Sequence, residues 1–196
     1  ISSSQRMQSL INDLLSFSRH PTGSSDFKPI DLNEIVNEAI VELEIKIEKS
    51  QGEVIVDELP GISGIPSLIR QLFYNLISNS LKFRKKDTTP KIFIHSRKIQ
   101  EPDSKAVSYE ILVADNGIGF DPQYAGDIFR VFKRLHSYHD FEGSGIGLSI
   151  CKKIVDKHNG TIHAESKPGE GATFIIRLPE MQEHEGANNA RESQKV

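Results

Sequence analysis

The sequence has no tryptophan and a single cysteine, Cys151. One cysteine excludes an internal disulfide framework and is compatible with a reducing compartment. Because Cys151 lies in an apolar helical run, we expect a small buried core residue rather than a reactive thiol. The chain also lacks a secretory signal and any apolar stretch near the ~20 residues that a membrane-spanning helix needs. We therefore expect no direct membrane contact by these residues.

A strong charge of either sign is also missing. The 196 residues carry a formal net charge of -3, so the composition gives no reason to expect nucleic-acid binding. The length allows one domain of ordinary size with appendages. Because the chain begins at Ile1 rather than methionine, we interpret it as a piece of a longer cytoplasmic protein, whose membrane anchor, if it has one, lies elsewhere.

Periodicity divides the chain into four parts. Residues 4–19, within a first part of residues 1–20, repeat apolar side chains at three- and four-residue steps, which predicts one amphipathic helix that needs a partner. Residues 21–26 are typical of a linker. Residues 27–180 contain the folded domain, and residues 181–196 are polar and aperiodic, which predicts a disordered tail.

Within the folded domain, the pattern predicts a mixture of helices and strands. Helices are expected from Asp31 to Gly52, from Pro66 to about Phe83 and from Ile146 to His158; strands are expected over 54–59, 91–99, 109–114, 161–166 and 171–178. Asp31 and Glu34 are spaced as in a capping box, and Pro66 suits a first helical turn. This order predicts an α+β fold, a mixed sheet with helices on one face.

The first chemical motif lies at residues 75–83, on the helix that begins at Pro66. Asn75 and Asn79 are four residues apart and Lys82 follows three later, so the three side chains share one helix face. Amide oxygens suit Mg²⁺, and lysine supplies a point charge for a phosphate. The alternative is a polar face in solvent, although asparagine is a poor helix former.

The second motif, residues 115–120, follows an apolar strand. The Asp115 carboxylate can accept a hydrogen bond from an exocyclic amine such as adenine N6, and Gly117 and Gly119 let the backbone approach a planar base. The alternative is an ordinary tight turn, for which Asn-Gly is a strong signal.

The third motif, residues 143–149, is a glycine-rich loop that leads into a helix. Its glycines expose amide N–H groups, and the start of the helix favours anions. Neither the Walker pattern nor the dinucleotide fingerprint fits, and a generic flexible loop is the alternative. Residues 121–142 before it form a long aromatic and basic segment, which is either functional or a solvated loop with anchoring phenylalanines.

Taken together, the motifs resemble the catalytic ATP-binding domain of sensor histidine kinases, in the superfamily shared by gyrase, Hsp90 and MutL. Residues 75–83 resemble its N box, 115–120 its first G box, 128–134 its F box and 143–149 its second G box. Residues 169–174 are similar to its closing glycine segment, and residues 132–136 to phytochrome-like and hybrid kinases. Residues 6–15 resemble the second helix of the dimerisation and histidine-phosphotransfer hairpin.

The resemblance implies a Bergerat-type two-layer α/β sandwich that binds ATP and Mg²⁺. Asp115 would bind the adenine amine with Thr173 nearby, and residues 121–142 would form a mobile ATP lid. The implied metal residues are Asn79, which would ligate Mg²⁺, and Asn75, close to the metal and the phosphates. Lys82 and Arg134 would contact phosphates, Phe83 would border the nucleotide, and the second G box would hold phosphates through its amides. The implied cofactor-binding set is Asn75, Asn79, Lys82, Phe83, Asp115, Gly117, Gly119, Phe132, Arg134, Gly143, Ser144, Gly145, Ile146, Gly147, Leu148 and Thr173.

The implied activity is donation of the ATP γ-phosphate to a histidine on the protein's own phosphotransfer hairpin, in a full-length homodimer, with relay to the receiver domain of a response regulator. The first hairpin helix with its acceptor histidine is missing from this sequence, so no catalytic residue is assigned and no autophosphorylation by these residues is expected. Ser80 stands where the family commonly has alanine.

Two other functions are open. In gyrase- or Hsp90-like ATPase clamps a glutamate at the position of Asn75 acts as general base, whereas an amide cannot accept a proton at neutral pH. The other is a degenerate pocket that acts only as an interaction module, against which Asp115, Asn79 and the glycines argue.

Overall fold

The structure, a computed structural model, describes residues 27–100, 106–135, 141 and 144–181. These residues form a five-stranded sheet in the order β2-β4-β5-β7-β6 and a separate two-stranded sheet, β1-β3. The elements are β1 (Lys28–Asp31), α2 (Leu32–Glu42), α3 (Glu44–Ser50), β2 (Glu53–Val56), β3 (Gly61–Gly64), α4 (Pro66–Lys82), β4 (Lys91–Gln100), β5 (Val107–Asp115), the 3-10 turn η2 (Pro122–Tyr124), α5 (Gly147–Lys157), β6 (Thr161–Lys167) and β7 (Gly171–Pro179).

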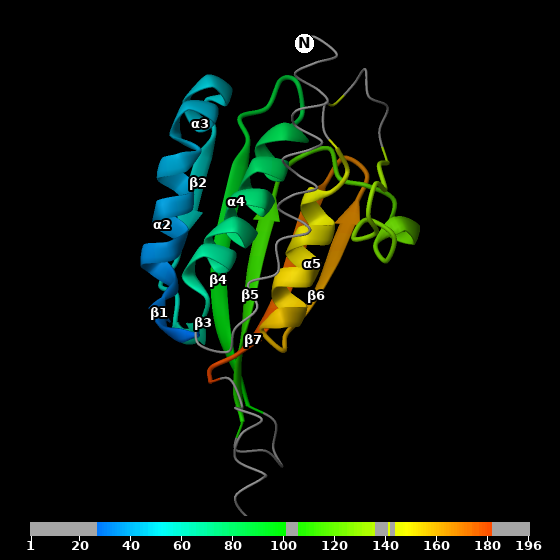
Figure 1. The fold of residues 1–196 in the computed structure, drawn as a ribbon. Coiled ribbons are helices and arrows are strands. Elements are labelled where there is room, and N and C mark those ends of the chain that lie inside the picture. The colour runs from blue at the N-terminus through cyan, green and yellow to red at the C-terminus, as the bar shows by residue number, and fades with distance from the viewer. Residues whose placement is uncertain (1–26, 101–105, 136–140, 142–143, 182–196) are drawn as a thin grey trace, which may run out of the picture.

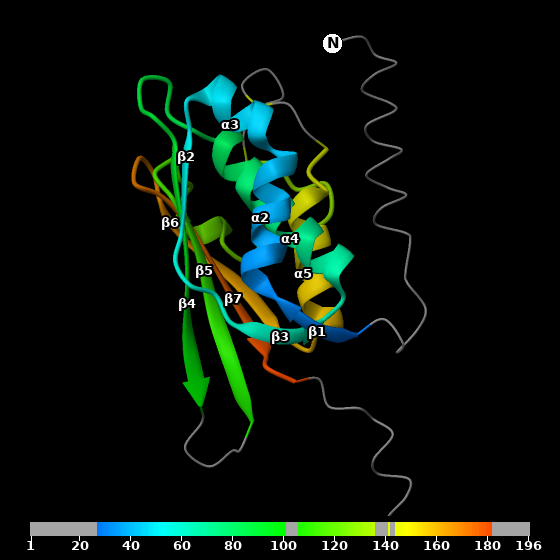
Figure 2. The same cartoon turned by 90° about the vertical axis from the view of Figure 1, so that its left-hand side faces the viewer.

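Helices and sheet form two layers. The sheet is mixed, since β2 pairs with β4 in parallel while β4–β5, β5–β7 and β6–β7 are antiparallel. Figure 1 shows α2, α4 and α5 side by side in front of the sheet, and the edge view in Figure 2 shows these three helices on one of its faces. The predicted α+β architecture is therefore confirmed.

The core lies between the two layers, with α4 at its centre. Burying the apolar stripe of each helix against the alternate side chains of the strands is what stabilises elements of this length. Fully buried side chains come from α4, β4, β5, α5 and β7, among them Phe73, Leu76, Ile77, Ile92, Ile111, Val155 and Ile176. Cys151 belongs to this core, as predicted, and burial raises the pKa of its thiol to about 12, which makes it unreactive.

Three local features differ from the sequence prediction. The helix expected from Asp31 to Gly52 is broken at Leu43, which ends α2 and begins α3. Asp31 caps α2 by accepting a hydrogen bond from the Asn33 N–H at 2.8 Å, one position earlier than a capping box requires. The short strands β1 and β3 were not predicted, because each has only four residues and their pairing joins segments about thirty residues apart.

Several predictions fall on residues outside the described ranges: the helix over 4–19, the linker, the tail and the turn near Pro102. No helix within the described ranges is long and apolar enough to cross a bilayer.

Candidate functional site

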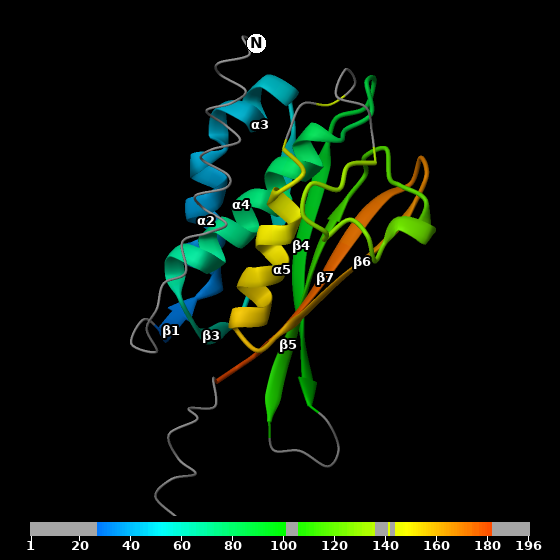
Figure 3. The same cartoon turned by 45° about the vertical axis from the view of Figure 1, so that its right-hand side comes forward.

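One large pocket, of about 1040 Å³, brings most of the predicted residues together. Its walls are α4, the end of β5, the start of β7, the first turn of α5 and the segment that follows η2, which Figure 3 shows beside α5. The predicted residues that line it are Asn75, Asn79, Lys82, Phe83, Asp115, Gly119, Arg134, Ser144, Gly145, Gly147 and Leu148.

The carboxylate of Asp115 is fixed by three donors. Its Oδ1 accepts from the backbone N–H of Gly117 at 2.9 Å and of Ala172 at 3.2 Å, and its Oδ2 accepts from the Ser80 hydroxyl at 2.9 Å. Burial raises the pKa of this carboxyl, while the three hydrogen bonds act in the opposite direction. The group is therefore a rigidly held acceptor at the wall of the pocket.

Two glycines allow the strands to close around this carboxylate. Gly119 has φ +63°, and a Cβ there would lie 2.1 Å from the Lys167 carbonyl oxygen. Gly171 has φ +94°, and a Cβ there would lie 1.9 Å from the carbonyl oxygen of Asp115. Any other residue would strain the backbone and force the β5 end away from β7.

The two asparagines on the polar face of α4 differ in the contacts that they make. Asn75 donates from Nδ2 to the carbonyl oxygen of Gly147 at 3.4 Å, which joins α4 to the first turn of α5. The Asn79 side chain lines the pocket and makes no hydrogen bond to the described residues. Lys82 lies over the Phe83 ring, with Nζ 4.5 Å from its centroid. Asn79 thus has its whole amide available for a ligand, whereas Asn75 uses its Nδ2 to hold the loop and keeps its Oδ1 for a ligand.

The donor set of this face fits Mg²⁺ bound largely through a polyphosphate. Among the described residues there is no group of three histidine, cysteine or carboxylate side chains that would form a cage for a metal. Mg²⁺ needs no such cage, because it keeps several waters and is commonly bound by one or two protein oxygens together with phosphate oxygens. The amide oxygen of Asn79 is suited to that role.

The described part of the glycine-rich loop leads into α5, which begins at Gly147. Ser144 accepts from the N–H of Ile146 at 3.3 Å, and Gly145 has φ +77° with its carbonyl accepting from the Phe132 N–H at 3.1 Å. The side chain of Ile146 is buried in the core. Ile146 can therefore contribute to the pocket only through its backbone. Gly143 lies outside the described residues.

The described part of the segment 121–142 also touches the pocket. Arg134 donates to the carbonyl oxygen of Phe141 at 2.8 Å, and the Phe141 ring is 5.0 Å from that of Phe83. Phe132, in contrast, is 61% exposed and does not line the pocket.

Thr173 is not in the pocket wall, and its neighbour Ala172 takes the place beside Asp115. In the β5–β7 register Asp115 pairs with Ala172, whereas Thr173 pairs with Ala114. Because paired residues point to the same face and neighbours to opposite faces, Thr173 lies on the side of the sheet away from the helices. Gly117 is not in the wall either, but its N–H binds Asp115.

Sequence reasoning missed the contribution of Ser80. This residue is 2% exposed and lies on the apolar side of α4, where its hydroxyl reaches Asp115. A polar residue at a buried position of an amphipathic helix is the signal that could have revealed this contact, since buried hydroxyls need a partner.

Comparisons with known proteins agree with this geometry. Residues 64–182 match the family described as histidine kinase-, DNA gyrase B- and HSP90-like ATPase. The phytochrome-like protein Cph1 of Synechocystis is 39% identical over 173 residues, which are 88% of this chain and 22% of that protein. The chain thus spans about a fifth of that relative's length.

Solved structures share the fold. The catalytic domain of the histidine kinase ThkA aligns with a TM-score of 0.64 and 28% identity, over 80% of this chain and 99% of that domain. ThkA in complex with the response regulator protein TrrA aligns with a TM-score of 0.65 and 23% identity, over 90% of this chain and 48% of that one.

Proposed function

Because this chain belongs to the histidine kinase-, DNA gyrase B- and HSP90-like ATPase family, as the ATP-binding catalytic domain of a sensor histidine kinase, we propose that its pocket binds ATP with Mg²⁺ and presents the γ-phosphate to a histidine. The observation that carries the proposal is the pocket itself, where a fixed carboxylate, an available amide and a glycine-rich helix start line one cavity.

At the base end, the Asp115 carboxylate accepts a hydrogen bond from the adenine N6 amine. The donors from Gly117 and Ala172 occupy Oδ1, and Ser80 occupies one lone pair of Oδ2. Each carboxylate oxygen has two acceptor positions, so Oδ2 retains one that can face the base. A carboxylate selects an amine donor over a carbonyl, which favours adenine over guanine.

At the phosphate end, Asn79 would hold Mg²⁺ through its amide oxygen, and the ion would supply positive charge for the phosphates. Lys82 and Arg134 add cations, and the amides of the loop that leads into α5 add donors together with the favourable dipole of the helix start. Asn75 positions this loop through its bond to Gly147.

The acceptor of the phosphate comes from outside the pocket. None of the described residues that line it is a histidine. Asn75 stands where an ATPase clamp needs a general base, and its amide cannot activate water at neutral pH. These observations support transfer to a histidine on a phosphotransfer hairpin over hydrolysis.

The wider architecture is proposed on the same basis. Residues 1–20 belong to the second hairpin helix, 21–26 are the linker, 27–180 are the catalytic domain and 181–196 a tail. The full-length protein acts as a cytoplasmic homodimer, with or without a membrane anchor elsewhere, and passes its phosphate to a receiver domain. ThkA, whose complex with the response regulator TrrA is solved, supports such a partner.

Calorimetric titration tests the nucleotide proposal. We expect a non-hydrolysable ATP analogue to bind with Mg²⁺ more tightly than without it, and more tightly than the GTP counterpart. If the chain binds no nucleotide, the nucleotide proposal is wrong, and the remaining alternative is that the domain is a degenerate interaction module.

A further inference from the structure

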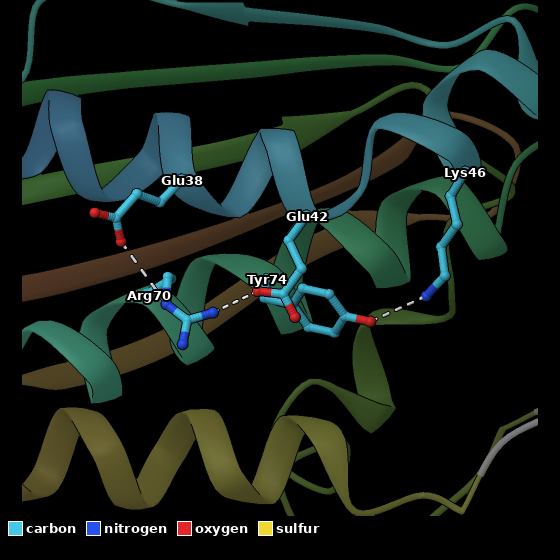
Figure 4. A network of polar contacts seen from close by, with 5 residues as sticks. All are labelled: Glu38, Glu42, Lys46, Arg70 and Tyr74. Atoms are coloured by element: carbon cyan, nitrogen blue, oxygen red, sulfur yellow. Dashed lines mark hydrogen bonds and ion pairs between the residues drawn. The ribbon is translucent and has the colours of Figure 1, made fainter.

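The pocket continues past the residues assigned above, across α4 toward α3. Lys46, Tyr74 and Ser78 line this extension. Lys46 Nζ donates to the Tyr74 hydroxyl at 3.2 Å and to the Ser78 hydroxyl at 3.3 Å, and lies 5.2 Å from the centroid of the Tyr74 ring. Figure 4 shows Lys46 extending from α3 to the hydroxyl of Tyr74 on α4.

The charge of Lys46 is not neutralised by its surroundings. Arg70, on the far side of Tyr74 from Lys46, is paired with two carboxylates, those of Glu42 and of Glu38, the latter at 3.8 Å. Within the described part of the chain, Lys46 forms no ion pair, and its two bonded partners are neutral hydroxyls. An ammonium held in place without a counter-charge is suited to bind an anion.

The position of Lys46 on α3 indicates which anionic group it binds. Ser78, its partner, adjoins Asn79 and precedes Lys82 by one turn, so Lys46 lies beside the face that holds the metal and phosphates. Ser80 lies two residues after Ser78, about 200° further around the helix axis, and contacts Asp115. Lys46 therefore lies on the side of α4 away from the base end, and the terminal phosphate is the part of ATP farthest from adenine.

We propose that Lys46, positioned by Tyr74 and Ser78, binds the γ-phosphate of ATP. The proposal rests on the proposed function and deepens it, because α3 then supplies a cation that recognises only the triphosphate. ADP has no third phosphate to reach Lys46, so the contact is lost once the phosphoryl group has been transferred.

The test compares ATP and ADP in one variant. For Lys46→Met we expect about tenfold weaker binding of a non-hydrolysable ATP analogue, the size of one charged hydrogen bond, and unchanged affinity for ADP. Tyr74→Phe should give a smaller loss in the same direction. Lys49→Met is the matched control, since it removes the same charge from α3 at an exposed position that does not line the pocket.

The outcomes separate the two proposals. Equal losses for ADP and the ATP analogue, or no loss for either, would overturn the role of Lys46 and leave the nucleotide pocket standing. A wild-type protein that binds neither nucleotide would overturn the proposed function itself. Because Lys46 is exposed, thermal unfolding of Lys46→Met should match that of Lys49→Met, which excludes misfolding as the cause.

Discussion

At the scale of single residues, the proposed recognition of the base depends on Asp115. Replacing it with alanine removes the acceptor for adenine N6, so we expect ATP affinity to fall by about 1.5–3 kcal/mol, the range for a charged hydrogen bond. Preference for ATP over GTP should fall with it. Calorimetry measures both, with Asp87→Ala as the control because Asp87 is exposed and outside the pocket. Unchanged ATP affinity in Asp115→Ala would show that Asp115 does not bind the base.

The two asparagines of α4 should respond differently to Mg²⁺. Asn79→Ala should weaken binding of the ATP analogue with Mg²⁺ far more than without it, since the amide acts through the ion. Asn75→Ala should weaken binding in both conditions, because the bond from Asn75 to Gly147 holds the loop whether or not the ion is bound. Titrations with Mg²⁺ and with a chelator distinguish the two. Identical behaviour of both variants would contradict this division of roles.

How far the sequence predicts these residues depends on whether the signal is local. The spacing of Asn75, Asn79 and Lys82 places them on one face because helix geometry is regular. The position of Asp115 follows from the end of its strand. Ala172 and Ser80 could not be assigned in this way, because their contacts with Asp115 join separate elements and depend on the β5–β7 register. Thr173 was assigned to the pocket by resemblance, one residue from the position that faces it.

At the scale of elements, one carboxylate joins three strands on the sheet face away from the helices. Glu110 of β5 is 2% exposed and accepts from Arg97 of β4 at 2.7 Å and from Arg177 of β7 at 2.8 Å. The hydrogen bond from Arg177 and then the contacts with Arg97 lower the pKa of Glu110, although burial opposes them. The carboxylate therefore stabilises the fold when ionised.

Glu110→Gln should lower the free energy of unfolding by about 1–2 kcal/mol at neutral pH. A lowered pKa means that this stabilisation is complete above the ordinary pKa of 4.5 and is lost as pH falls through the lower folded value. Denaturant unfolding at several pH values should show wild type and variant converging in acid. Glu165→Gln, an exposed change on the same sheet face, is the control. A difference that stays constant with pH would contradict the role of the charge.

His158 links the end of α5 to the start of α4. Its Nε2 accepts from the Ile65 N–H at 3.0 Å and its Nδ1 lies 2.7 Å from the Ile154 carbonyl oxygen, so the ring is neutral with its proton on Nδ1. Burial lowers the pKa of this imidazole below its ordinary 6.5. Protonation would break the bond to Ile65 and bury a charge.

The stabilising effect of neutral His158 is complete above pH 6.5 and is lost as pH falls through the folded pKa. His158→Gln should be less stable than wild type by about 1–3 kcal/mol at neutral pH, and should lose less stability between about pH 7 and about pH 5. Urea unfolding measures both quantities. His163→Gln, an exposed change, should keep the wild-type dependence; the same slope in His158→Gln would show that His158 does not titrate in this range.

Elements with a strong local period were predictable, and those that depend on distant partners were not. The α4 pattern and the β6–β7 hairpin have a continuous apolar period and clear end signals. The β1–β3 pair has neither, since four-residue strands carry little periodicity and these two are separated in the chain by α2, α3 and β2. The break at Leu43 leaves the apolar period of the helix intact, so the pattern alone does not reveal it.

At the scale of the whole molecule, α5 is joined to α4 at both of its ends. Asn75 contacts the first turn of α5, and His158 at the other end of α5 contacts Ile65 before α4. The helices thus form one rigid wall over the sheet, which holds the base end and the phosphate end at a fixed separation. In the proposed function this wall binds and orients ATP, and a histidine outside the pocket accepts the phosphate.

The most direct test of this account is phosphate transfer from γ-labelled ATP. The chain is incubated with Mg²⁺ and labelled ATP, alone and with a separate hairpin polypeptide that carries the acceptor histidine of the same parent protein. We predict acid-labile label on the hairpin, none on the chain alone, and, with ATP below saturation, at least about tenfold slower labelling of the hairpin when Asp115→Ala replaces the wild type. Positioning of the acceptor is worth ~7–11 kcal/mol of the barrier, so its absence should abolish transfer. Acid-labile label on the chain alone, or release of inorganic phosphate at an equal rate without the hairpin, would contradict the account.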